Sequence, residues 1–121
     1  MAKIQQFEDL QSWQKARELS NVVYKATIGK DFSRDFDLRN QIRRASSSVM
    51  HNIAEGFDSG SDAEFARFLR IARRSSSEVQ SQLYLAFDLK YISQAQFDQL
   101  YALCDEVKKL INGFLRYLNK K

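Results

Sequence analysis

The amino-acid sequence predicts an all-α protein that folds as an antiparallel, up-down-up-down bundle of four helices. The chain of 121 residues has no proline and only four glycines, the two residue types that most often interrupt helices. Apolar residues recur at steps of three and four through four long stretches, which places them on one helical face. The predicted helices span about residues 8–28, 36–55, 62–90 and 94–118, in a chain whose length suits a single domain.

The first predicted helix starts near Glu8 and Asp9, acidic residues that are favourable at the positive end of a helix dipole. We expect Gly29 to end it, because the residues that follow, up to Asp35, are polar and rich in turn formers. Its expected buried stripe consists of Leu10, Trp13, Ala16, Leu19, Val23 and Ala26.

The second predicted helix carries the most distinctive stretch of the chain, from Gln41 to Gly56. We expect Gly56 to lie just beyond the helix end, where a left-handed backbone favours glycine. The apolar seam of this helix consists of Leu38, Ile42, Ala45, Val49 and Ile53.

Serine residues mark the starts of the third and fourth predicted helices. Ser61 with Glu64, and Ser93 with Gln96, match the capping box, in which two side chains bond to free backbone N–H groups. The expected core residues of the third helix are Phe65, Phe68, Ala72, Val79, Leu83 and Ala86, with Leu69, Ser76 and Phe87 beside them.

The fourth predicted helix has more apolar residues than one seam of a small bundle requires. Excess apolar surface is typical of a subunit interface, so we expect the protein to form a homo-oligomer. The alternative is a generous core with a few exposed apolar side chains. The residues concerned are Leu110, Ile111, Phe114, Leu115 and Leu118, with Tyr117 nearby.

The net charge of +4 is mildly basic, which is compatible with nucleic acid or an acidic partner but requires neither. Residues 38–54 and 65–74 together contain seven arginines and no acid. No apolar run approaches the ~20 residues that a membrane span needs, and no signal peptide is recognisable. The single cysteine, Cys104, cannot form an intrachain disulfide and is expected to be buried. We therefore expect a cytoplasmic protein without membrane contact.

The sequence predicts no catalytic or metal site. A di-iron bundle needs two Glu-x-x-His pairs, whereas this chain has one histidine, His51, with no glutamate three residues before it. His51 and Glu55 can touch on one helical face, but two ligands do not make a metal site, and a solvated or interfacial histidine is the preferred interpretation. The chain has no phosphate-binding glycine loop, zinc-ligand cluster or nucleophile motif. We therefore expect no enzymatic activity, no cofactor and no metal.

Two serine runs, residues 46–48 and 75–77, lie near the middles of the second and third predicted helices. Small residues allow helix backbones to approach closely, and serines within a helix can bond to their own helix. We therefore expect tight packing between these two helices. Phosphorylation by a kinase that recognises Arg-Arg-x-Ser is the less favoured alternative.

Three polar residues beside the apolar seams form a further candidate feature. Asn52, Glu55 and Glu78 are predicted to be at least partly buried, and buried carboxylates need partners. Arginines of the same helices are the nearest cations with several donors. A structural polar network, within or between subunits, is preferred over a ligand pocket.

The arginines are the candidate contacts to nucleic acid. Arg67, Arg70 and Arg74 are spaced to share one helical face, with Arg73 at its edge, and Arg39 and Arg43 share another. If the second and third helices are neighbours, these faces can merge into a basic patch suited to phosphates. No aromatic platform is interleaved, so stacking on bases is not expected. The alternative is a solvated face with salt bridges to loop acids. The complete candidate set is Arg39, Arg43, Arg44, Arg67, Arg70, Arg73 and Arg74.

A series of motifs follows a characteristic order over nearly the whole chain. It consists of residues 7–10, 13–16, 19, 23–24, 41–45, 48, 52–57, 65, 68–69, 71–72, 75, 78 and 82–83. Together these motifs, above all Gln-Ile-Arg-Arg-Ala and Asn-Ile-Ala-Glu-Gly, resemble the four-helix-bundle family encoded by intervening sequences in bacterial 23S ribosomal RNA genes. The family is often labelled S23 ribosomal protein.

This resemblance implies a bacterial cytoplasmic protein with no known enzymatic activity, folded as a left-handed antiparallel bundle and assembled into a ring, typically a pentamer. A more distant similarity is to the accessory protein of diversity-generating retroelements. That similarity implies a basic pentamer that associates with a reverse transcriptase and with nucleic acid. The chain departs from the family pattern at residues 27–30 and 48–52, where relatives usually have proline. The missing proline predicts a straighter second helix.

The leading hypothesis is therefore a non-enzymatic, ring-forming bundle that binds RNA or DNA through arginines of the second and third helices. The alternative is a structural or protein-binding oligomer whose arginines serve subunit contacts.

Overall fold

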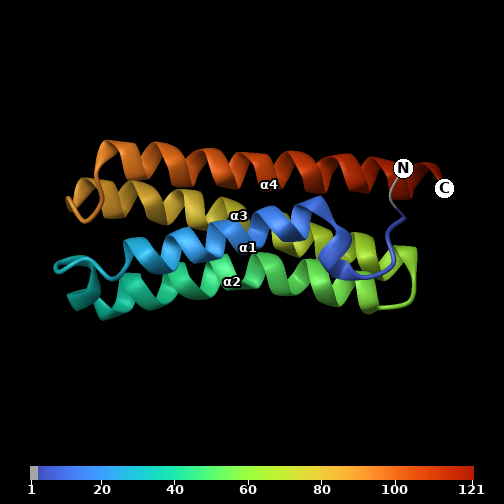
Figure 1. The fold of residues 1–121 in the computed structure, drawn as a ribbon, viewed down its shortest axis with the longest axis horizontal. Coiled ribbons are helices and arrows are strands. Elements are labelled where there is room, and N and C mark those ends of the chain that lie inside the picture. The colour runs from blue at the N-terminus through green and yellow to red at the C-terminus, as the bar shows by residue number, and fades with distance from the viewer. Residues whose placement is uncertain (1–2) are drawn as a thin grey trace.

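The computed structural model describes residues 3–121, which form four long helices packed side by side (Figure 1). The helices are α1 (Gln11–Ala26), α2 (Phe36–Asp58), α3 (Asp62–Asp88) and α4 (Gln94–Lys120), with the short 3-10 helices η1 (Phe7–Asp9) and η2 (Phe32–Arg34). Consecutive helices run antiparallel, and α1 also contacts α4, which closes the bundle. No strand occurs within residues 3–121. The prediction of an all-α four-helix bundle is confirmed.

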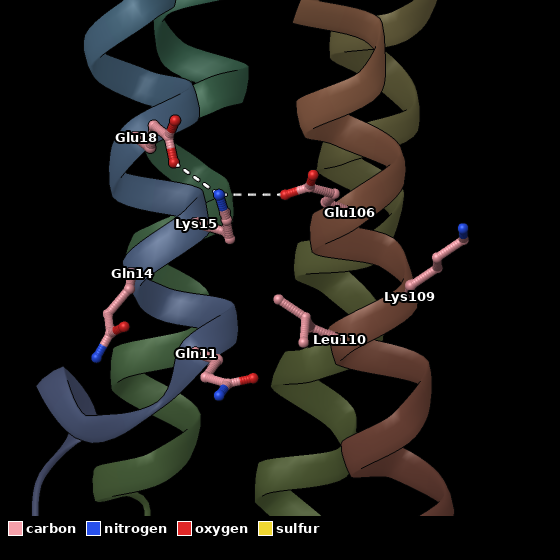
Figure 2. A pocket seen from close by; sticks show the side chains of 7 residues that line it. All are labelled: Gln11, Gln14, Lys15, Glu18, Glu106, Lys109 and Leu110. Atoms are coloured by element: carbon pink, nitrogen blue, oxygen red, sulfur yellow. Dashed lines mark hydrogen bonds and ion pairs between the residues drawn. The ribbon is translucent and has the colours of Figure 1, made fainter.

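The side chain of Lys15 joins the first and last helices, α1 and α4. The Nζ atom of Lys15 lies 3.1 Å from Oε2 of Glu18 on its own helix and 3.2 Å from Oε2 of Glu106 on α4 (Figure 2). Hydrogen bonds to these carboxylates, first to Glu18 and then to Glu106, raise the pKa of the Lys15 ammonium. The positive charge of Lys15 is therefore compensated.

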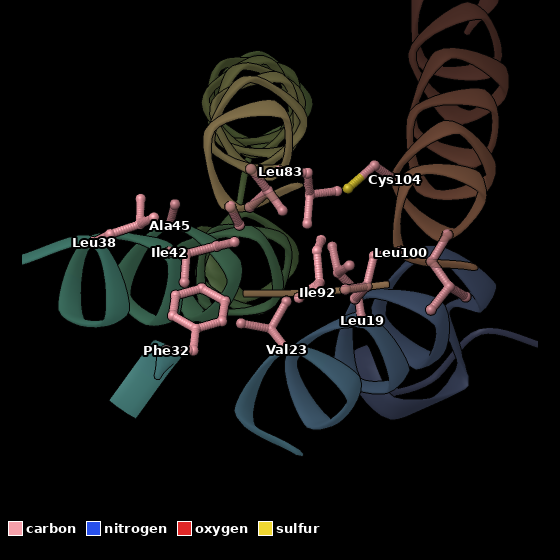
Figure 3. Close-up of a cluster of buried hydrophobic side chains, with 13 residues drawn as sticks. Leu19, Val23, Phe32, Leu38, Ile42, Ala45, Leu83, Ile92, Leu100 and Cys104 are labelled. Carbon is pink, nitrogen blue, oxygen red and sulfur yellow. The ribbon is translucent and has the colours of Figure 1, made fainter. Parts of the chain in front are cut away.

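Two clusters of apolar side chains form the core, one toward each end of the bundle. Between them lie small polar residues, because Ser46 and Ser76 are fully buried near the middles of their helices. The first cluster includes Leu19, Val23, Phe32, Ile42, Leu83 and Leu100 (Figure 3). The second includes Ala16, Val49, Ile53, Leu69, Val107 and Ile111.

The serine runs lie at the contact between α2 and α3, as predicted. The hydroxyl oxygens of Ser48 and Ser75 are 3.0 Å apart and join the two helices directly. Ser46 bonds back to its own helix, donating to the backbone oxygen of Arg43 at 3.0 Å. Ser76 instead donates to the backbone oxygen of Cys104 on α4 at 3.2 Å. The prediction of close packing between the second and third helices is confirmed.

Gly56 has a different role from the predicted one. It lies inside α2, which continues to Asp58, and a Cβ atom at this position would come within 2.7 Å of Cβ of Phe68. The glycine therefore allows α2 and α3 to approach, rather than ending the helix. The residues with left-handed backbone are Gly60, with φ of 90°, and Lys90, with φ of 65°.

Other helix boundaries differ from the predicted ones by a few residues. α1 ends at Ala26, before Gly29, and the hydroxyl of the buried Thr27, the next residue, donates to the backbone oxygen of Tyr24 at 2.9 Å. α3 stops at Asp88, two residues early, just before the left-handed Lys90, and α4 continues to Lys120.

The core face of α3 is also rotated slightly from the predicted one. Leu69 is fully buried, whereas Phe68 is only half-buried. Phe68 lies against Gly56 on the α2 side of the helix, so it covers the edge of the core and does not fill it.

Only one of the two predicted capping boxes forms completely. The Ser93 hydroxyl accepts from the Gln96 backbone at 3.1 Å, and the Gln96 side chain accepts from the Ser93 backbone at 2.8 Å. At α3 the Ser61 hydroxyl accepts from the Glu64 backbone at 3.1 Å, but the Glu64 carboxylate turns to Arg67 instead. Of the helices formed by residues 3–121, none is both long and apolar enough to cross a membrane.

Candidate nucleic-acid interface

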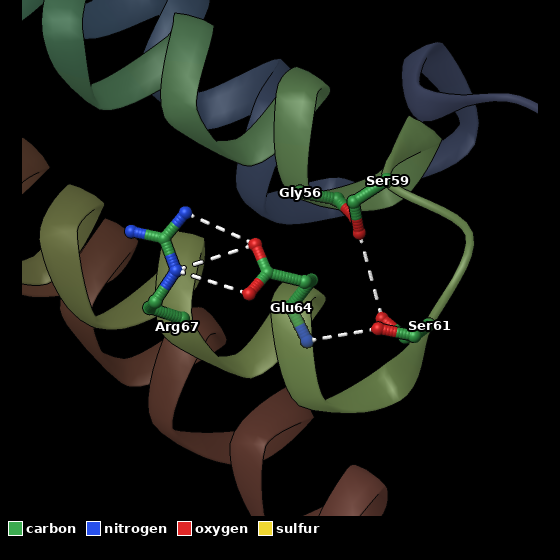
Figure 4. A network of polar contacts seen from close by, with 5 residues as sticks. All are labelled: Gly56, Ser59, Ser61, Glu64 and Arg67. Atoms are coloured by element: carbon green, nitrogen blue, oxygen red, sulfur yellow. Dashed lines mark hydrogen bonds and ion pairs between the residues drawn. The ribbon is translucent and has the colours of Figure 1, made fainter.

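Three arginines lie on the outer face of α3, as their spacing predicts. Arg67, Arg70 and Arg74 are all exposed. Arg67 is paired within its own helix, since its Nη2 atom lies 3.0 Å from Oε2 of Glu64 and its guanidinium lies 4.6 Å from the ring centre of Phe68 (Figure 4). Hydrogen bonds from Arg67 lower the pKa of the Glu64 carboxyl. Arg70 and Arg74 make no ion pair with any residue that the structure describes.

Arg73, the fourth arginine of this helix, turns from the outer face toward α4. It is half-buried, and its Nη1 atom donates a hydrogen bond of 2.8 Å to Oδ1 of Asn112. It lines a groove of about 460 Å³ between α3 and α4, together with Arg70 and Arg116. We call this space the α3–α4 groove.

Arg39 and Arg43 lie on the side of α2 that faces the α1–α2 connection. The Nε atom of Arg43 donates to Oγ1 of Thr27 at 2.8 Å, and Nη1 of Arg39 donates to the backbone oxygen of Ser33 at 3.0 Å. Both arginines therefore hold the connection between α1 and α2. They do not join the arginines of α3, so the predicted merging of the two faces into one basic patch does not occur.

Aromatic rings lie against both of these arginines. The guanidinium of Arg39 is 4.8 Å from the ring centre of Phe36, and that of Arg43 is 4.7 Å from the ring centre of Tyr24. Tyr24 comes from another helix, so no pattern within α2 indicates its contact with Arg43. These rings stack on the protein's own guanidinium groups.

Arg44 stands apart from the other arginines of α2. It is exposed and lines a shallow, polar groove together with Asp37 and Glu78, on the side of α2 that faces α3. This position combines one cation with two carboxylates, so the local charge does not favour an anion.

The predicted polar network forms around Asn52 but does not include the carboxylates. The Nδ2 atom of Asn52 donates to the backbone oxygen of Ser48 at 2.8 Å and to its hydroxyl at 2.9 Å, and Ser48 bonds to Ser75. Glu55 and Glu78 are exposed, so the prediction that they are partly buried is wrong. Each lies just beyond the α2–α3 seam, where water solvates the charge, and Glu78 accepts a hydrogen bond only from Gln82 within the described chain.

The residues typical of catalytic sites are scattered in this bundle. No group of three or more histidine, cysteine, aspartate or glutamate side chains within residues 3–121 is arranged to hold a metal ion. His51 is exposed on α2. Cys104 is fully buried, and burial raises the pKa of its thiol to about 12, which keeps it protonated.

The residue that sequence analysis missed is Arg116 on α4. Its position four residues after Asn112 places both on one side of α4, but nothing in the local sequence shows that this side faces Arg70 and Arg73. Only the packing of α3 against α4 brings the three arginines to one groove.

Comparison with known proteins agrees with this architecture. The chain matches the family model described as 23S rRNA-intervening sequence protein over residues 8–113. It is also similar to a crystal structure of a protein of unknown function from the S23 ribosomal protein family of Bacteroides thetaiotaomicron. The TM-score is 0.78 at 25% sequence identity, and the alignment covers 86% of this chain and 97% of that chain. No match was found among curated proteins.

The matched family is one of unknown function, without a known catalytic activity. Because its model spans most of the sequence, the four-helix bundle described above belongs to the 23S rRNA-intervening sequence protein family.

Proposed function

We propose that this protein is a non-enzymatic, oligomeric helical bundle that binds RNA or DNA through arginines. The main support is that Arg70 and Arg74 are exposed on one face of α3 and have no carboxylate partner in the described chain. An arginine without an internal partner is free to bind phosphate oxygens with its fork of donors. Arg39 and Arg43 have a smaller role in this proposal, because their donors are already bonded to the α1–α2 connection.

An apolar surface favours the oligomeric part of the proposal. The side chain of Leu85 is 49% exposed, and that of Tyr117 on α4 is 56% exposed. Leu85 follows Arg67 by about five helical turns, so it lies on the same outer face of α3. The second half of this face is mostly polar, with Glu78, Ser81 and Asp88. Its exposed apolar residues gather near the end of α3, where Tyr84 and Leu89, 53% and 46% exposed, flank Leu85. An exposed apolar surface of this kind is typical of a subunit contact.

The same surface supports a second candidate function, that of a structural or protein-binding oligomer. In that case the α3 arginines would contact carboxylates of a neighbouring subunit, such as the exposed Glu55 and Glu78. Either function is compatible with a ring of five subunits and with a cytoplasmic protein whose one cysteine stays reduced.

The two functions differ in their response to salt and to charge reversal. We would measure binding of labelled structured RNA and duplex DNA by fluorescence anisotropy across a salt series, with mass by light scattering on the same samples. If Arg70 and Arg74 each contact a phosphate of duplex DNA, R70E/R74E should reduce the slope of log K against log salt by about 1.8. Its mass should remain that of the wild type.

A matched control is R17E/K109E, which changes the charge equally on exposed residues of α1 and α4. This control should bind nearly as the wild type does. If wild-type oligomers bind neither nucleic acid at low salt, the nucleic-acid function is wrong. If R70E/R74E breaks the oligomer instead, the arginines serve subunit contacts.

A further inference from the structure

The α3–α4 groove gathers positive charge that nothing in the described chain neutralises. Arg70, Arg73 and Arg116 line it, and none of them forms an ion pair with residues 3–121. One carboxylate also lies on the groove, that of Asp62, but its Oδ2 atom is 3.2 Å from Nζ of Lys121. Like charges that share a groove repel one another, and a bound anion relieves this repulsion.

The register of the two helices places the arginines opposite one another. Ser76 bonds to the backbone of Cys104, and Arg73 bonds to the side chain of Asn112. Residue numbers therefore decrease along α3 in the direction in which they increase along α4. One further turn in the same direction places Arg70 across from Arg116. The groove therefore receives guanidinium groups from both walls.

The guanidinium of Arg116 lies near Gly113. A Cβ atom built on Gly113 would lie 3.8 Å from Nη2 of Arg116, so the head of this side chain folds back one turn along α4. That turn is the one on which Arg73 is already bonded, through Asn112. Small residues, Ala63 and Ala66, line the α3 wall and leave space beside the arginines.

Asn112 orients Arg73 without neutralising it. Its Oδ1 atom accepts from Nη1 of Arg73 at 2.8 Å, and an amide oxygen carries no net charge. The groove therefore combines one guanidinium held in place, that of Arg73, with the exposed guanidinium groups of Arg70 and Arg116. Guanidinium forks match the oxygens of a phosphate group.

Two other basic positions of the bundle lack this combination because a carboxylate neutralises each of them. Lys15 in the groove between α1 and α4 is paired with Glu18 and Glu106, and Arg67 is paired with Glu64 (Figures 2 and 4). We propose that the α3–α4 groove binds a backbone phosphate of nucleic acid, held by Arg70, Arg73 and Arg116. This inference rests on the proposed function and assigns it a specific site, in which Arg116 is a contact residue.

The test uses R116Q, which removes one guanidinium from α4 and leaves the outer face of α3 intact. Its matched control is K109Q, which removes one exposed cation from the same helix on the α1 side. With labelled duplex DNA, R116Q should bind at least tenfold more weakly at low salt. The slope of log K against log salt should also fall by about 0.9, the loss of one phosphate contact. K109Q should bind as the wild type does, and R116K, which keeps the charge but not the fork, should lie between R116Q and wild type.

The possible failures are distinguishable. If R116Q binds like the wild type while R70E/R74E does not, the groove assignment is wrong and the proposed function stands. If the wild type binds no nucleic acid, both are wrong. In that case, inorganic pyrophosphate is titrated into the wild type and R116Q in a calorimeter. Saturable heat that appears in the wild type but not in R116Q would identify a free phosphate compound as the ligand of the groove. Thermal unfolding by circular dichroism checks that R116Q folds. If R116Q does not fold, the binding affinity of R116K is measured in its place.

Discussion

Arg73 on α3 and Asn112 on α4 are joined across the bundle by a hydrogen bond of 2.8 Å between Nη1 and Oδ1. The bond holds a half-buried guanidinium in place but leaves its positive charge uncompensated. Elsewhere on the protein, at Lys15 and at Arg67, a carboxylate occupies the equivalent position. This difference leaves the α3–α4 groove with a positive charge that attracts anions, whereas the charges of Lys15 and Arg67 are compensated.

Replacing the amide by a carboxylate should abolish this attraction without disturbing the fold. N112D has nearly the same shape and places a negative charge beside Arg73, so the melting temperature should stay the same or rise, because the new hydrogen bond is charge-assisted. Binding to duplex DNA at low salt should fall at least tenfold, as measured by anisotropy. The control is N40D, because Asn40 also accepts from an arginine, Arg39, at 3.2 Å on a different face. Equal effects of the two variants would contradict a local site.

Gly56 and Gly113 should respond in opposite ways to alanine. In G56A the new methyl group would meet Phe68 at 2.7 Å, so we expect the free energy of unfolding to fall by about 1–3 kcal/mol through overpacking of α2 against α3. In G113A the methyl group would have only the flexible end of Arg116 nearby, at 3.8 Å, and we expect a gain of about 0.5–1 kcal/mol from helix propensity. Urea unfolding measures both. A G56A protein as stable as G113A would show that the helices do not approach so closely.

The thiol of Cys104 should be unreactive in the folded protein. Burial raises its pKa to about 12, so almost no thiolate is present at pH 8, and the side chain has no access to solvent. Labelling by Ellman's reagent should therefore be slow in buffer and fast in urea. Rapid labelling of the native protein would place Cys104 outside the core.

The same raised pKa predicts a pH dependence of stability. The folded state holds the thiol proton more tightly than the unfolded state, whose cysteine has a pKa of about 8.5. The stabilisation is therefore complete below about pH 8 and is lost as the pH rises toward 12. Since lysines and tyrosines titrate in the same range, the measurement is the difference between wild type and C104A from pH 8 to pH 11. The stability of the wild type should fall more steeply.

The sequence predicts those features that depend on local periodicity. The seam from Leu38 to Ile53 is buried as expected, because the spacing of apolar residues determines which side of α2 leaves water. The capping box of Ser93 and Gln96 forms for the same reason, since both partners lie within one turn. The shared face of Arg67, Arg70 and Arg74 likewise follows from spacing alone.

The role of Gly56 depends on the distance between α2 and α3. The sequence specifies only where Gly56 lies along α2 and contains no information on that distance. A glycine near a helix end suits a left-handed residue, but here α2 continues past it, and the approach of Phe68 makes the missing side chain necessary. The burial of Glu55 and Glu78 was likewise predicted wrongly, because the width of the α2–α3 contact decides which flanking residues reach water.

The formation of four helices, the apolar side of each and the shared face of the α3 arginines could be predicted from the amino-acid sequence, because these properties repeat within a few residues of one chain. The neighbour that each polar face meets depends on the packing of the whole bundle. Packing placed Arg39 and Arg43 on the α1–α2 connection, left Arg70 and Arg74 in solvent, and brought Arg116 to the same groove as Arg73. A helix fixes the angles between its own side chains, whereas its neighbours depend on how all four helices bury their apolar sides together.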